Sequence, residues 1–136
     1  EDERGLATLA TWQELARRSL EHRVKLKDMV EAEILAGNKV IGYGASARSS
    51  TLLNFCGIDS RHLSCIADQS PLKHDRYTPG TNVLVVSPER ALAERPDTIL
   101  LLAWNFRDEI LGQLADAGFH GNVIVPLPND PQLLKV

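Results

Sequence analysis

A glycine-rich turn is the part of this sequence whose residue types and spacing point most directly to chemistry. The apolar run 39–43 leads into the pattern Gly42-x-Gly44-x-x-Ala47, and a helical pattern follows. Glycines at this spacing let a strand turn tightly into a helix, with backbone N–H groups open to a pyrophosphate. The pattern therefore predicts a phosphate-binding turn; the alternative is a tight turn that binds nothing.

Charged residues stand where they could assist such a ligand. Asp68 ends the second apolar run, where an acidic residue can bind a ribose hydroxyl, although it can equally cap a loop. Arg48 follows the turn and can pair with a phosphate, or it can be an exposed helix arginine. Lys73 lies in the charged loop segment 73–76 beyond the second run, and the alternative for that segment is a solvated loop.

A third group follows the fourth apolar run. Trp104 and Asn105 can stack on and hydrogen-bond a base or sugar at the carboxyl edge of a sheet. In the alternative interpretation, Trp104 covers the sheet edge while Asn105 caps the helix expected at 106–117. The predicted nucleotide- or sugar-binding residues are Gly42, Tyr43, Gly44, Ala45, Ser46, Arg48, Asn54, Asp68, Lys73, Trp104 and Asn105.

Short apolar runs without polar alternation must position these residues. Such runs are typical of strands that are buried on both faces of a parallel sheet. The expected strands are 39–43, 63–67, 83–86, 98–103 and 122–125, and the expected helices between them are 47–55, 88–94 and 106–117. Right-handed crossovers then favour an α/β, Rossmann-like three-layer domain whose five-stranded parallel sheet has the order 3-2-1-4-5.

A long amphipathic helix is expected ahead of this domain, from Thr11 as its N-cap to Ala36. The chain then divides into an N-terminal helical segment, 1–36, and one compact nucleotide- or nucleotide-sugar-binding unit, 37–136. The helix has little to pack against except the sheet, so we expect part of it to project toward a neighbouring domain or subunit. The connection 68–82 is long enough to predict a functional or mobile loop.

Composition excludes several classes of function. The 136 residues carry a net charge of −3, which lacks the basic excess that nucleic-acid binding requires. No run is long enough to span a membrane and no signal peptide is evident, so the cytoplasm is the expected location. Cys56 and Cys65 lie in apolar stretches and are expected to be reduced. The scattered histidines predict no metal site, and we assign no catalytic residue.

Several ordered motifs together resemble a known family. The sequence is similar to the C-terminal domain of the sugar C-methyltransferases over about residues 11–130. The motifs that carry the resemblance are Gly42-Tyr43-Gly44-Ala45-Ser46-Ala47-Arg48, Leu52-Leu53-Asn54-Phe55-Cys56-Gly57-Ile58, Asp68 with Pro71-x-Lys73, Thr78-Pro79-Gly80-Thr81, Ser87-Pro88-Glu89 and Leu102-Ala103-Trp104-Asn105-Phe106.

The resemblance implies a transferase built from several parts. Such enzymes have a zinc-binding N-terminal part, a central S-adenosylmethionine (SAM)-binding methyltransferase domain and this C-terminal domain. They methylate a carbon of a nucleotide-linked keto sugar, typically dTDP-linked, through an enolate formed in the central domain. The implied role of this chain is to hold the nucleotide-linked sugar against that domain, in cis or in trans. It lacks a methyl-donor motif, so we expect an excised or stand-alone domain that is inactive by itself.

Two other functions remain open. The Gly42-x-Gly44-x-x-Ala47 pattern with Asp68 also fits an NAD(P)-binding domain that acts in keto-sugar reduction, although Tyr43 and Tyr77 lack a lysine four residues on. The third alternative is a vestigial Rossmann domain that serves as a structural or interaction module. These alternatives differ in whether a ligand binds at the carboxyl edge of the sheet, and in which ligand it is.

Overall fold

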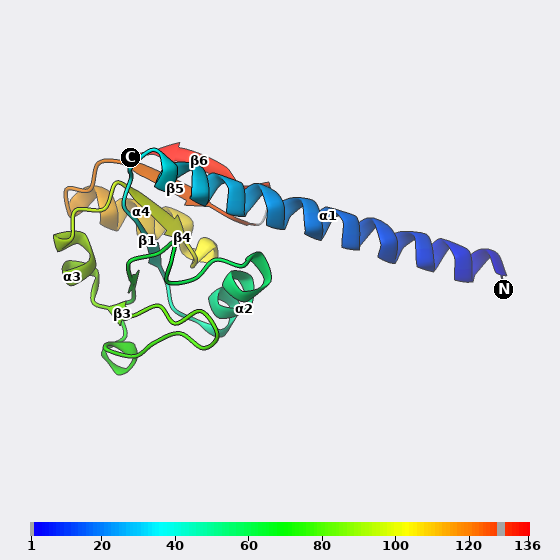
Figure 1. Ribbon diagram of the computed structural model, residues 1–136, viewed down its shortest axis with the longest axis horizontal. Coiled ribbons are helices and arrows are strands. Elements are labelled where there is room, and N and C mark those ends of the chain that lie inside the picture. The colour runs from blue at the N-terminus through cyan, green and yellow to red at the C-terminus, as the bar shows by residue number, and fades with distance from the viewer. Residues whose placement is uncertain (1, 128–129) are drawn as a thin grey trace.

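The computed structural model describes residues 2–127 and 130–136 and places helices on both faces of one sheet (Figure 1). The helices are α1 (Asp2–Leu35), α2 (Ala47–Cys56), α3 (Pro88–Ala93) and α4 (Arg107–Asp116), with 3-10 turns η1 (Pro71–Lys73) and η2 (Trp104–Phe106). The strands are β1 (Val40–Tyr43), β2 (Ile66–Ala67), β3 (Val85–Val86), β4 (Thr98–Leu101), β5 (Asn122–Val125) and β6 (Gln132–Lys135).

The sheet has the order β3-β2-β1-β4-β5-β6. Its first five strands are parallel and confirm the expected order 3-2-1-4-5. The expectation of five strands was one short, because β6 pairs antiparallel with β5 along the edge that the five-stranded sheet would expose. The fold is therefore Rossmann-like, with a mixed sheet of six strands.

Two apolar layers, one on each face, hold the sheet between the helices. On one face, Leu26 and Val30 of α1 and Leu53 of α2 pack against side chains of β1, β2 and β4. On the other face, Ala91 of α3 and Leu114 of α4 pack against the alternate side chains of the same strands. This alternation is the reason why the strand sequences are apolar throughout, since each face of a doubly covered sheet is buried.

Helix α1 begins at Asp2, well before Thr11, so the expected N-cap at Thr11 was wrong. Its C-terminal part lies on the sheet, whereas its N-terminal part projects far beyond the rest of the molecule (Figure 1). Leu9, Trp12 and Leu15 are exposed on the projecting part. The helix thus carries apolar side chains that the described residues do not cover.

Glu33 ties the end of α1 to the sheet. Its Oε1 accepts hydrogen bonds from Thr98 Oγ1 at 2.6 Å and from Asn122 Nδ2 at 2.8 Å, and its Oε2 accepts one from Asn38 Nδ2 at 3.3 Å. Burial opposes ionisation of Glu33, but these three hydrogen bonds outweigh it and lower the carboxyl pKa below its usual value. The carboxylate therefore fixes α1 against the starts of β4 and β5.

The connection from Asp68 to Asn82 has more structure than a loop. It contains η1, and an isolated antiparallel bridge joins Tyr77 to Leu84. Both cysteines are free thiols and are buried. None of the helices in the described ranges is long and apolar enough to cross a membrane.

Candidate functional site

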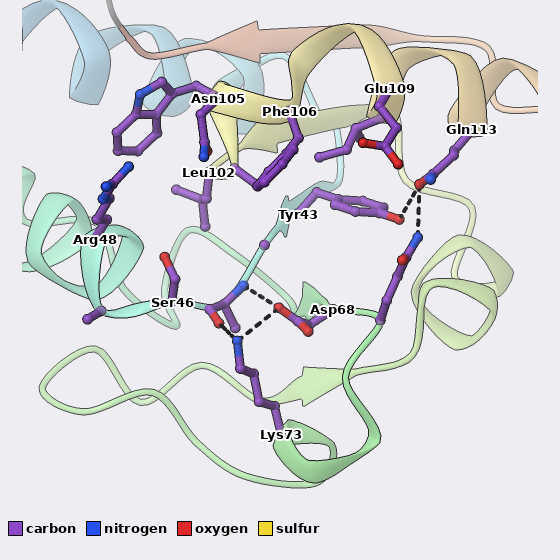
Figure 2. Close-up of a pocket in the computed structure, with 17 residues that line it drawn as sticks. Tyr43, Ser46, Arg48, Asp68, Lys73, Leu102, Asn105, Phe106, Glu109 and Gln113 are labelled. Carbon is purple, nitrogen blue, oxygen red and sulfur yellow. Dashed lines mark hydrogen bonds and ion pairs between the residues drawn. The ribbon is translucent and has the colours of Figure 1, made fainter.

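A hollow of about 640 Å³ opens at the carboxyl edge of the sheet, between the ends of β1 and β4. In the sheet, β2 lies on one side of β1 and β4 lies on the other side of β1. The hollow between β1 and β4 is therefore at the topological switch point, where the strand order reverses. Open α/β sheets bind their ligands at this position. The walls come from the segments that follow β1, β2 and β4, and from α4 (Figure 2).

The two glycines of the turn are required by packing within the protein. Gly44 has a φ of +106°, and a Cβ there would lie 2.7 Å from the Cβ of Ala103. A Cβ on Gly42 would lie 2.9 Å from Cδ1 of Leu102. The N–H of Gly44 donates to the carbonyl of Ala67 at 2.7 Å. Close approach of the β4 end therefore accounts for both glycines without a ligand.

Asp68 organises the turn. Its Oδ2 accepts a hydrogen bond from the N–H of Ala45 at 2.8 Å, and its Oδ1 accepts one from the N–H of Ser70 at 2.8 Å. Lys73 Nζ lies 3.6 Å from Oδ2 and also donates to the Ala45 carbonyl (Figure 2). Both carboxylate oxygens are thus engaged by the protein's own donors, and they join the glycine turn to the loop after β2.

The start of α2 offers the open donors of the site. Ser46 and Ser49 form a reciprocal capping box, in which the N–H of Ser49 donates to Ser46 Oγ at 3.2 Å and the N–H of Ser46 to Ser49 Oγ at 2.7 Å. Between these two serines, the N–H groups of Ala47 and Arg48 have no acceptor among the residues that the structure describes. These two donors and the helix dipole favour an anion.

The segment after β4 forms the 3-10 turn η2 and carries aromatic side chains. Trp104 is half-buried and packs against both apolar layers, whereas Phe106 is exposed on the rim of the hollow. Helix α4 starts at Arg107 with Phe106 as its N-cap and no side-chain cap, so the alternative in which Asn105 caps this helix was wrong. Asn105 lines the hollow instead.

A hydrogen-bonded group lines the other end of the hollow, and it joins the predicted Tyr43 to two residues that the sequence did not predict, Gln69 and Gln113. Gln69 Nε2 donates to Gln113 Oε1 at 2.9 Å, and the Tyr43 hydroxyl donates to the same oxygen at 3.4 Å. Burial raises the pKa of the Tyr43 hydroxyl, which keeps it protonated and able to donate. The glutamines belong to segments far apart in sequence, and only the fold brings them together.

The comparison with known proteins gives the family. Residues 1–128 match the family described as the C-methyltransferase C-terminal domain. The chain belongs to this family. The C-methyltransferase NovU of Streptomyces niveus is 34% identical over 138 residues, which cover 99% of this chain. The chain spans 32% of the length of that relative.

In this C-methyltransferase C-terminal domain, the structure brings together all of the predicted site residues except Gly42 and Asn54. Gly42 is buried within β1. Asn54 faces away from the hollow, because its Nδ2 donates to the carbonyls of Ser50 at 2.9 Å and Pro79 at 3.2 Å. It joins α2 to the loop that precedes β3.

The charged side chains that line the domain's hollow are Arg48, Lys73, Asp68 and Glu109. Arg48 is exposed and forms no ion pair within the described residues, while Lys73 sits beside the turn. Glu109 is the acidic side chain on the α4 wall. In the described ranges no cluster of three or more His, Cys, Asp or Glu side chains is arranged to hold a metal ion.

Proposed function

We propose that this domain binds the nucleotide-linked sugar substrate of a SAM-dependent sugar C-methyltransferase, whose methyl-transfer chemistry lies in the rest of the enzyme. The observation that carries the proposal is the pair of open N–H groups of Ala47 and Arg48 at the start of α2, on the wall of a hollow at the switch point. With the Arg48 side chain they provide three donors for a diphosphate. Lys73, which already pairs with Asp68 and donates to the Ala45 carbonyl, adds a positive charge nearby.

The hollow also suits the remainder of such a ligand. A volume of about 640 Å³ is within the range of small-molecule sites. Trp104 and Phe106 offer aromatic faces for stacking, while Asn105, Gln69 and Gln113 offer amide groups for hydrogen bonds.

The NAD(P) alternative fits this geometry less well. A dinucleotide-binding fold uses the acidic residue after the second strand to hold a ribose hydroxyl. Both oxygens of Asp68 already accept hydrogen bonds, from the N–H groups of Ala45 and Ser70. The Asp68 side chain is also only 14% exposed, so a ribose hydroxyl would have to reach a carboxylate that these bonds hold within the turn.

A methyltransferase domain is the partner that we propose for helix α1. The relative is about three times as long as this chain, and its name describes a whole C-methyltransferase. Leu9, Trp12, Leu15 and Leu20 are exposed on α1, and uncovered apolar side chains in a row mark an interaction surface. If this face serves the methyltransferase domain and not a second copy, the chain alone should be monomeric in light scattering. A dimer that Leu20→Glu dissociates would instead assign this face to contact between two copies.

Ligand titration with a thermal-shift readout tests the substrate proposal. The ligands are dTDP, dTDP-glucose, NAD, NADPH and SAM, because a ligand that binds only the folded state stabilises it by about 2.7 kcal/mol at a hundredfold excess over its dissociation constant. We expect stabilisation by dTDP and dTDP-glucose alone. Stabilisation by NAD or NADPH alone would support the reductase alternative, and no response to any of them would support the structural module.

A matched pair of variants links binding to the start of α2. Arg48→Gln should weaken dTDP binding about tenfold, because it removes a charged hydrogen bond to phosphate. Arg18→Gln is the control, because Arg18 is also exposed but pairs with Glu14 on α1, away from the hollow. Equal losses in both variants would show that the effect of Arg48 is only a general change of net charge.

A further inference from the structure

The two ends of the hollow differ in chemistry. At one end the side chains of Tyr43, Gln69 and Gln113 form a hydrogen-bonded group. Because Gln113 Oε1 accepts both bonds, its Nε2 group is left as a donor, while Gln69 Oε1 is left as an acceptor. The same three side chains border a second hollow of about 660 Å³ on the far side. This end therefore presents directional hydrogen-bonding groups.

The opposite end is apolar and continues outward. Past Arg48 and Trp104 the surface leads into a shallow hollow of about 440 Å³, which Phe55 and Leu127 also line. Figure 2 shows Arg48 and Gln113 at opposite ends of the main hollow, with Ser46 and Asp68 between them. The open donors at the start of α2 thus lie between a polar end and an apolar end.

The apolar end lies close to α1. The guanidinium carbon of Arg23 in α1 lies 5.8 Å from the centre of the Phe55 ring, so the two helices meet there. Leu20 and Val24 are 53% and 56% exposed on the same helix. Phe55 therefore stands between α1, with its uncovered Leu20 and Val24, and the shallow hollow that Trp104 lines at the mouth of the main one.

We propose a fixed direction for the ligand: its base lies at the Gln69–Gln113 end, its diphosphate at the start of α2, and its sugar at the Trp104 end. This proposal rests on the proposed function and deepens it. The reacting sugar carbon must reach a methyl donor that the methyltransferase domain holds, and α1, which we propose as the contact surface for that domain, lies nearer to the Trp104 end. The amide groups of Gln69 and Gln113 then recognise the edge of the base, because an acceptor next to a donor can match the hydrogen-bonding groups of a base edge.

Truncated ligands make the direction measurable. Calorimetry with dTDP and dTDP-glucose separates contacts to the nucleotide from contacts to the sugar. Gln113→Leu should weaken both ligands by the same factor, about fivefold, because it removes hydrogen bonds to the part that they share. Trp104→Leu should leave the dTDP affinity within about twofold and weaken dTDP-glucose about fivefold.

A fluorescence measurement gives the same information without disturbing the site. The chain has two tryptophans, and Trp12 lies on the projecting part of α1. In the Trp12→Phe variant, Trp104 is the sole tryptophan. Its emission should shift more on addition of dTDP-glucose than on addition of dTDP. This readout stays valid even if Gln113→Leu or Trp104→Leu fails to fold.

Two different results would overturn the inference. If Gln113→Leu selectively weakens dTDP-glucose while Trp104→Leu weakens both ligands, or if dTDP shifts Trp104 emission as much as dTDP-glucose does, the direction is wrong although the nucleotide site stands. If neither ligand binds the parent chain, the proposed function fails and the direction fails with it. The two failures are therefore distinguishable.

Discussion

Removal of the Asp68 carboxylate tests the geometry of the glycine turn directly. In Asp68→Ala, the N–H groups of Ala45 and Ser70 both lose an acceptor that lies 2.8 Å away. A hydrogen bond to a charged partner contributes about 1.5–3 kcal/mol. Both donors are only partly buried, so water replaces part of the loss and the lower value applies to each. The sum is about 3 kcal/mol, and Lys73 adds little because its side chain is half-exposed.

The assay is urea unfolding followed by circular dichroism, with the free energy extrapolated to water. Asp68→Asn keeps one acceptor oxygen and should lose about half as much stability as Asp68→Ala. Asp116→Ala is the control, because this exposed residue at the end of α4 has no ion pair within the described residues, and it should change stability by less than about 0.5 kcal/mol. If Asp68→Ala abolishes ligand binding but costs no more stability than the control, Asp68 serves the ligand and not the turn.

Further predictions concern stability, pH and thiol reactivity. Gly44→Ala should cost at least about 2 kcal/mol in urea unfolding because of its positive φ and the close contact, whereas Gly112→Ala, which meets open space within α4, should stabilise by about 0.5–1 kcal/mol; equal effects would contradict the packing argument. Because the folded-state pKa of Glu33 lies below its ordinary 4.5, its contribution is present above pH 4.5 and is lost as pH falls through the lowered value. Glu33→Gln should therefore flatten the fall of the unfolding free energy in acid, and an unchanged pH profile would count against this role. Burial raises the pKa of Cys56 to about 11 and that of Cys65 to about 12, so mass spectrometry should find neither alkylated by iodoacetamide at pH 8 unless urea is added.

The central strands could be predicted because burial on both faces leaves a plain sequence signal. The same signal predicts some strands that are too long, because a residue can be buried without pairing in the sheet. Leu63 and Cys65 are buried, yet β2 begins only at Ile66. The reverse holds for β6 (Gln132–Lys135), which is mostly exposed and has no β-branched residue, so its sequence gives no strand signal. It forms because β5 offers an unpaired edge, which is a property of the assembled sheet.

The candidate site was predictable in position but not in its internal contacts. Chain order and the glycine turn place Asp68 and Trp104 at the carboxyl edge. The sequence does not reveal that Asp68 already has its partners, because those partners are backbone N–H groups that any residue supplies. Nor does it distinguish Gln113 from an ordinary solvent-facing position of α4. Its proximity to Gln69 depends on how α4 packs against the sheet.

The glycine pattern alone therefore does not discriminate between ligands. Gly44 would be needed even in a protein that binds nothing, since Ala103 leaves no room for a side chain. The features that distinguish one ligand from another are the N–H groups that already donate within the protein and those that do not. The turn uses the N–H of Ala45 for Asp68, so the open donors lie further along, at Ala47 and Arg48. These donors are next to Arg48, whereas the turn itself holds the Asp68 carboxylate, and this arrangement supports the proposed nucleotide-linked sugar over a ligand whose ribose must bond to Asp68.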